Sequence, residues 1–172
     1  AIYLSQDRTD IQFATKELSR GMSKPCVRDY RKLQKMGRYL IGKETCVMKY
    51  GYQSKPTDIK VWTDTDYAGC KRTRKSTSGG VIMLGGHLMK SWSSTQAVIA
   101  LSSGEAEYYG MVRGGSTGIG FRSILEDLGM KAKVRISTDS SAAKGISGRS
   151  KTSVKHGVCQ LSVENTCPIL SS

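Results

Sequence analysis

The sequence lacks the features that mark small secreted domains and membrane proteins. Its five cysteines, at positions 26, 46, 70, 159 and 167, are odd in number and include no Cys-x-x-Cys pair, so neither a disulfide framework nor a zinc site is expected. No apolar run approaches the roughly 20 residues needed to span a bilayer, and no stretch resembles a signal peptide. We therefore expect a protein of a reducing compartment that has no membrane segment and is not secreted.

Acidic residues are also scarce. The 172 residues include 27 Lys and Arg against 14 Asp and Glu, which gives a formal net charge of +13. The excess runs along the chain, with 12 basic and 5 acidic side chains in residues 1–57 and 15 and 9 in residues 58–172. Such a charge favours a polyanionic partner, most commonly nucleic acid, although a merely soluble basic surface has the same composition. The length suffices for one good core with a small appendage.

The few acids are concentrated where strands are predicted to end. Residues 58–66, which include the run VWTDTD, are predicted to form a buried strand that delivers Asp64 and Asp66 to the end of a sheet. Because side chains alternate along a strand, both acids face the same side. The pattern leaves their roles open, since Asp64 is better fixed on the strand, whereas Asp66 could orient water or form a polar turn.

Two further acidic stretches follow, LSSGEAEYY at 101–109 and VRISTDSSAA at 134–143. Glu105 and Glu107 would lie about 200° apart on a helix, so only one of them can face the sheet. Periodicity decides poorly between them, but small neighbours would let the Glu107 side approach a strand closely. Asp139 closes a strand and opens a helix, where it is either a ligand or an N-cap. One carboxylate from each stretch makes an oxygen-only ligand set that suits Mg²⁺ better than Zn²⁺.

The remaining chain is predicted to mix helices and strands. A helix at 9–20 is expected to be capped by Thr9 or Asp10, and a basic helix at 27–41 either follows a phosphate backbone or exposes a solvated face. A polar boundary is expected at 50–57, and no periodicity is visible beyond Ser147. The other predicted elements are strands at 80–84, 87–92 and 133–138 and helices at 102–112, 117–128 and 140–146. Two explanations stay open for the many glycines of the helices at 102–128: close packing on a sheet or decay of the sequence.

Three strings of this sequence resemble one known family. TDTDYAGCKRTRKSTSGG, SWSSTQAVIALSSGEAEYYG and ISTDSSAAKG are similar to the ribonuclease H domain that ends the polyprotein of copia-type LTR retrotransposons. YLSQDRTDIQFATKELSRGMSKP resembles the end of the reverse transcriptase region of the same elements, and the matches together cover roughly residues 3–156. The resemblance implies an α/β, ribonuclease H-like fold, in which a mixed sheet of three antiparallel strands plus a parallel strand is flanked by helices.

The resemblance also implies a domain organisation. Residues 1–57 would be the connector helices that end the reverse transcriptase region, 58–156 the ribonuclease H-like domain, and 157–172 a degenerate or disordered tail. We expect the chain to be a piece of a longer translation product. Its implied partners are an RNA/DNA hybrid and the remainder of the polyprotein, including the reverse transcriptase, in a cytoplasmic element particle or in the nucleus.

The implied activity is two-metal hydrolysis of the RNA strand of an RNA/DNA hybrid, with two Mg²⁺ ions for which Mn²⁺ can substitute. By resemblance the metal ligands are Asp64, Glu107 and Asp139, where the triplet Ala106-Glu107-Tyr108 selects Glu107. His156 would assist product release. Phosphates and ribose hydroxyls would be contacted by basic and hydroxyl side chains, although a charge run is often only solvated. These predicted contacts are Lys71, Arg72, Arg74, Lys75, Ser76, Ser78 and Ser103.

The sequence departs from the family's pattern after His156. Gly157 and Val158 stand where the family has a further acidic residue, and Glu164 lies too far along to replace it. Losing one of four carboxylates would weaken the binding of one metal ion. The alternative function is therefore a non-catalytic remnant of a transposable element that still binds nucleic acid.

Overall fold

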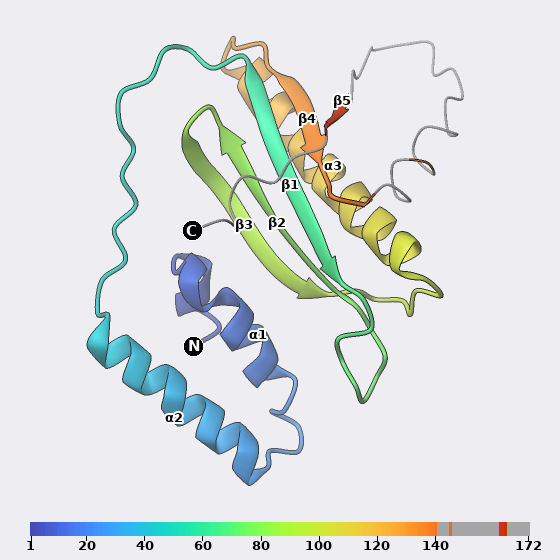
Figure 1. Ribbon diagram of the computed structural model, residues 1–172. Coiled ribbons are helices and arrows are strands. Elements are labelled where there is room, and N and C mark those ends of the chain that lie inside the picture. The colour runs from blue at the N-terminus through green and yellow to red at the C-terminus, as the bar shows by residue number, and fades with distance from the viewer. Residues whose placement is uncertain (141–144, 146–161, 165–172) are drawn as a thin grey trace. The chain divides into compact units, whose positions relative to one another are not determined.

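The structure of the protein is a computed structural model that describes residues 1–140, 145 and 162–164 (Figure 1). The chain divides into two compact units, Ala1–Tyr50 and Gly51–Ser172. Within the described ranges, no helix combines the length and the apolar character that crossing a bilayer requires. The helix predicted at 140–146 lies almost entirely outside the described residues.

The first unit is a pair of helices, α1 (Gln12–Ser19) and α2 (Val27–Gly42), preceded by short 3-10 turns at Leu4–Gln6 and Thr9–Ile11. The prediction that Thr9 or Asp10 caps the first helix is wrong, because the residue at the N-cap of α1 is Ile11 and it makes no side-chain cap bond. Much of the apolar surface of α2 is exposed. Tyr30 and Leu33 are exposed, and the buried apolar side chain of this helix is Met36.

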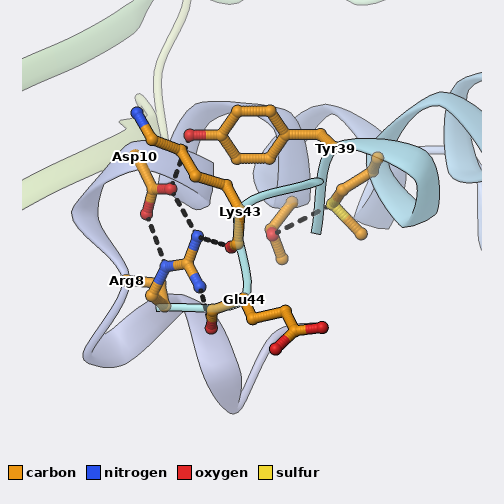
Figure 2. A network of polar contacts seen from close by, with 7 residues as sticks. Arg8, Asp10, Tyr39, Lys43 and Glu44 are labelled. Atoms are coloured by element: carbon orange, nitrogen blue, oxygen red, sulfur yellow. Dashed lines mark hydrogen bonds and ion pairs between the residues drawn. The ribbon is translucent and has the colours of Figure 1, made fainter. Parts of the chain in front are cut away.

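Asp10 instead pairs with a buried arginine. The Arg8 guanidinium donates to Asp10 through Nε (3.0 Å) and Nη2 (2.7 Å), and Tyr39 Oη donates to the same carboxylate at 2.8 Å. Arg8 also donates to the backbone oxygens of Lys43 and Glu44, just past the end of α2 (Figure 2). This network fixes the start of the unit to its last helix. The Arg8 guanidinium and the Tyr39 hydroxyl hold the pKa of Asp10 well below its usual range.

The second unit is built on a mixed sheet. Its strands are β1 (Asp58–Asp66), β2 (Thr77–Leu84), β3 (His87–Thr95), β4 (Lys133–Ser137) and β5 (Ser162–Glu164). Among the described residues their order is β3-β2-β1-β4-β5, in which β2 runs antiparallel to β1 and β3, while β4 is parallel to β1 and to β5 (Figure 1). The predicted arrangement of three antiparallel strands and a parallel strand is confirmed. The sequence did not predict β5, which lies beyond the point where periodicity ends.

Burial alternates along β1 as predicted. Ile59, Val61, Thr63 and Thr65 are buried, whereas Asp64 and Asp66 are exposed on the opposite side. The buried side faces α3 (Ser103–Asp127), which packs on β1, β2 and β4. The apolar core lies between this helix and the sheet, and it includes Ile59, Val61, Ile82, Met111, Leu125, Val134 and Ile136.

The single helix α3 replaces the two helices predicted at 102–112 and 117–128, so that prediction is wrong. The glycines between them stay helical because they face the sheet. A Cβ at Gly114 would lie 2.5 Å from Thr63 Cγ2, and one at Gly118 would lie 2.8 Å from Val134 Cγ1. Close packing therefore accounts for these two glycines. Gly120 has no neighbour within 4 Å of a Cβ and gains nothing from packing.

Candidate metal centre

Three carboxylates converge at one edge of the second unit. Asp64 lies on β1, Glu107 on the second turn of α3, and Asp139 two residues past β4. One oxygen from each lies within 4.8 Å of the others. The parallel register of β1 and β4 explains the meeting of the two aspartates. Trp62 pairs with Ser137, and each aspartate follows its strand residue by two positions.

The structure separates Asp64 from Asp66. Asp64 Oδ1 accepts a hydrogen bond from the Thr65 backbone N–H at 2.8 Å, and its carboxylate joins the cluster. Asp66 turns back over the loop that follows, where a Cβ on Gly69 would lie 1.7 Å from Asp66 Oδ2. This orientation fits the polar-turn role that the sequence had left open for Asp66, and a side chain at position 69 would require this carboxylate to move.

The two glutamates of α3 also have different roles. Ser102 is the N-cap of the helix, and its hydroxyl accepts from the Glu105 backbone N–H at 3.2 Å. Glu105 in turn accepts from the Leu101 backbone N–H at 2.7 Å and from the Tyr109 hydroxyl at 3.1 Å. These contacts resemble a capping box, and they leave Glu107 as the helix carboxylate that faces the sheet edge. The Ser-x-x-Glu spacing at 102–105 is typical of such a cap, so the sequence already held a signal for the role of Glu105 that helical periodicity alone does not reveal.

The surroundings of Glu107 disfavour its charged form. Burial raises the pKa of this carboxyl group to about 7, and the nearby charges of Asp64 and Asp139 act in the same direction, while a backbone hydrogen bond with Thr65 opposes them. Glu107 Oε2 is buried and has no hydrogen-bond partner. A partly buried acid that lies close to two others and has an unpartnered oxygen fits a cation ligand. The donor set contains only carboxylate oxygens, as expected for Mg²⁺ or Mn²⁺.

Two predicted nucleic-acid contacts do not reach the surface. Ser76 and Ser78 are buried, with 0% and 2% of their surface exposed. The Ser76 hydroxyl accepts from the Ala68 backbone N–H, and the Ser78 hydroxyl accepts from the Gln96 side chain. The prediction that these two hydroxyls contact nucleic acid is therefore wrong, because both are used inside the protein. Ser103 is exposed at the first position of α3.

The basic loop between β1 and β2 is held in a defined shape. Lys71, Arg72 and Arg74 are exposed, and Lys75 Nζ donates to the Ala97 backbone oxygen at 2.6 Å. The Arg74 backbone N–H donates to the Cys70 oxygen at 2.7 Å, which closes a turn inside the loop. The loop therefore presents three of its four predicted cations to solvent. His156, the remaining predicted site residue, lies outside the described residues.

A buried amide that joins β2 to α3 was not predicted from the sequence. Gln96 follows β3 directly and is 8% exposed. Its Nε2 donates to Ser78 Oγ and to the Ala106 backbone oxygen, both at 2.8 Å. In the sequence, one polar residue before the run AVIAL does not differ from an ordinary loop residue, so no pattern indicated this role.

The order and directions of the strands define a ribonuclease H-like domain. In this domain α3 connects β3 to β4, and the acids lie at the edge where β1 and β4 end. A Pol polyprotein from transposon RE1 of Arabidopsis thaliana is 33% identical over 132 residues, 75% of this chain and 9% of the relative. Another, from transposon TNT 1-94 of Nicotiana tabacum, is 32% identical over 126 residues, 73% of this chain and 9% of the relative. The chain belongs to the family of copia-type retrotransposon Pol polyproteins.

Two further comparisons cover less of the chain. An uncharacterized mitochondrial protein of Arabidopsis thaliana is 33% identical over 107 residues, 62% of this chain and 44% of the relative. The chain thus spans less than half the length of these relatives. The crystal structure of LC11-RNase H1 in complex with RNA/DNA hybrid aligns with 56% of this chain and 65% of that one, at 19% identity and a TM-score of 0.41. No protein-family model matches the chain.

Proposed function

We propose that this domain hydrolyses the RNA strand of RNA/DNA hybrids with the help of two divalent metal ions. The observation that carries the proposal is the convergence of Asp64, Glu107 and Asp139, from three separate elements, to within 4.8 Å. Carboxylates at this separation repel one another unless cations lie between them. When bound there, Mg²⁺ or Mn²⁺ would activate water and offset charge on the phosphate.

The chain's own residues would hold and orient this site. Asp64 is fixed by its strand and by the Thr65 backbone N–H, so its carboxylate suits a ligand that two ions share. Glu107 approaches from α3 with its Oε2 unpartnered, and Asp139 closes the set from the end of β4. We propose that His156 assists release of the product, as the family resemblance implies.

The exposed cations next to the site would bind the hybrid's phosphates. Lys71, Arg72 and Arg74 lie on the loop that follows Asp64 and Asp66, so phosphate contacts there would orient the duplex without selecting a sequence. The exposed Ser103 would contact ribose hydroxyls, through which a protein distinguishes RNA from DNA. We further propose that residues 1–57 are the end of the reverse transcriptase region, so that the rest of the polyprotein is the natural partner.

One observation favours the alternative function, a non-catalytic remnant that binds nucleic acid. Gly157 and Val158 occupy the positions at which the family has a further acidic residue. Three carboxylates without the fourth would bind one of the two ions more weakly, which would lower hydrolysis before it affects binding to the hybrid. Both functions therefore predict binding to the hybrid, and only the first predicts cleavage of its RNA strand.

A cleavage assay with matched variants tests the proposal. The full chain would be incubated with an RNA/DNA hybrid labelled on the RNA strand, with Mg²⁺, with Mn²⁺ and with EDTA. Asp64→Asn removes a cluster ligand, while Asp66→Asn changes a neighbouring acid that lies outside the cluster. Cleavage that needs a metal ion, survives Asp66→Asn and is lost in Asp64→Asn supports the enzyme. Binding without cleavage supports the remnant, and absence of salt-sensitive binding contradicts both.

A further inference from the structure

We propose that Gln96 is a positioning residue that couples the strand of Asp64 to the helix of Glu107 and so sets the geometry of the metal centre. The inference rests on the proposed function for the identity of the cluster as a metal site. Gln96 does not contact the cluster. It acts through Ser78 and Thr65 on one side and through Ala106 on the other.

The backbone and side chain of Gln96 join three elements. Its backbone N–H donates to the Ser76 oxygen at 2.9 Å, which holds the residue at the end of the β2–β3 pair. Its side-chain Nε2 then donates to Ser78 Oγ on β2 and to the Ala106 oxygen on α3, both at 2.8 Å. With Gln96 only 8% exposed, water cannot readily replace these bonds. The first turns of α3 are therefore tied to the sheet through one amide group.

The Ala106 contact fixes the helix next to the glutamate. Ala106 immediately precedes Glu107, is itself fully buried, and offers a backbone carbonyl that can only accept. The amide must therefore direct its NH₂ group at this carbonyl, and the orientation of Gln96 follows from chemistry. A carboxylate in the same place would bring its oxygen against the Ala106 backbone oxygen, and neither atom could donate a hydrogen bond. The contact thus requires a donor of this length.

The Ser78 contact leads to the aspartate. Ser78 Oγ lies 3.4 Å from Thr65 Oγ1, and the Thr65 backbone N–H donates to Asp64 Oδ1 at 2.8 Å. Gly110 keeps α3 close to this hydroxyl pair, because a Cβ there would lie 2.6 Å from Thr65 Oγ1. Gln96 therefore reaches the residue after Asp64 and the residue before Glu107 within the same buried network.

The test substitutes Gln96 with methionine, which keeps the length of the side chain and removes both N–H donors. Leu125→Ala serves as the control, since it opens a core cavity in the last turn of α3, 18 residues beyond Glu107. Mn²⁺ binding to the full chain would be measured by electron paramagnetic resonance. Hydrogen exchange of peptides covering residues 103–111 and 119–127 would be measured without metal.

We expect Gln96→Met to raise the Mn²⁺ dissociation constant about 10-fold, the lower end of the effect of removing a group bonded directly to a metal ligand, and to speed exchange several-fold at 103–111 only. Leu125→Ala should leave Mn²⁺ affinity within about threefold of the parent and speed exchange mainly at 119–127. An equal loss of Mn²⁺ affinity in both variants, or unchanged affinity in Gln96→Met, would overturn the inference.

The exchange measurement separates this inference from the proposed function. If the parent chain binds no Mn²⁺, the metal function is contradicted, and Gln96 is then judged by exchange alone. Faster exchange at 103–111 in Gln96→Met would still support the tie between α3 and the sheet. Unchanged exchange there would overturn it, whatever the metal result.

Discussion

Replacing Glu107 by glutamine should stabilise the metal-free protein at neutral and alkaline pH. The carboxyl group has a pKa raised from 4.5 to about 7, chiefly by burial and then by the charges of Asp64 and Asp139. Between these two pH values the folded state binds the proton more tightly than the unfolded chain does. The free energy of unfolding of the parent therefore falls as pH rises through this window, while the glutamine variant carries no such dependence at this position.

The size of the effect follows from the shift. At about 1.36 kcal/mol for each pKa unit, the full change amounts to about 3.4 kcal/mol. Because Glu107 is only partly buried, solvent reduces the cost of its charge, and we expect about 1–2 kcal/mol in practice. The free energy of unfolding of Glu107→Gln should exceed that of the parent by this amount at pH 8 in EDTA. Near pH 4 the two free energies should be equal.

Urea denaturation followed by circular dichroism at pH 4, 6 and 8 measures the difference. Glu126→Gln is a suitable control, because Glu126 lies exposed on the same helix in an i,i+4 ion pair with Arg122. It should change stability by no more than about 0.5 kcal/mol. Added Mg²⁺ should stabilise the parent more than Glu107→Gln, since binding to the folded state alone raises its stability. If Glu107→Gln is no more stable than the parent at pH 8 in EDTA, the account of a partly buried carboxylate beside two other negative charges is wrong.

Three further predictions concern the rest of the chain. Gly114→Ala should destabilise the second unit by about 1–3 kcal/mol, because the added methyl group would clash with β1. Gly120→Ala lies on the same helix in open space and should stabilise the unit by about 0.5–1 kcal/mol. Urea denaturation of both variants measures the two effects. Asp10→Asn should lower the melting temperature of the first unit at pH 7, because it leaves the buried Arg8 guanidinium without its charged partner. The difference in melting temperature from the parent should shrink as pH falls through the range in which Asp10 is protonated. The double variant Lys71→Gln and Arg74→Gln should weaken hybrid binding. It should also reduce the steepness of log K against log salt concentration by about 0.9 for each phosphate that the loop no longer neutralises, measured by fluorescence anisotropy over a salt series. An unchanged slope would show that the loop does not contact the hybrid.

The strands were predictable from the sequence because their pattern is local. The alternation along residues 58–66 placed Asp64 and Asp66 on the same side of the strand, and the structure has both of them exposed on one side. The continuity of α3 was not predictable. Glycine lowers helix propensity, and only contact with Thr63 and Val134 across the core shows why Gly114 and Gly118 remain helical.

The site was predictable to a different degree for each residue. The parallel pairing of β1 with β4 carries Asp64 and Asp139 to one edge, and only the family resemblance implied it, because α3 connects β4 to β3 and not to β1. The choice of Glu107 came from the family resemblance, and the Ser102-x-x-Glu105 cap pattern would have supported it without a structure. The burial of Ser78 could not have been predicted. In the sequence, a serine after a basic loop that turns inward looks the same as one that faces solvent.

The fold and the chemistry of this domain depend on different residues. The core between α3 and the sheet consists of apolar side chains such as Val61, Ile82 and Val134, none of which belongs to the acid cluster. The acids add mutual repulsion and little packing, so removing one of them should leave the sheet intact. An inactive copy is therefore not an unfolded copy, and loss of cleavage alone cannot distinguish a remnant from a chain that never folded. A cooperative urea transition makes that distinction, because an unfolded chain with a net charge of +13 would still attract a polyanion.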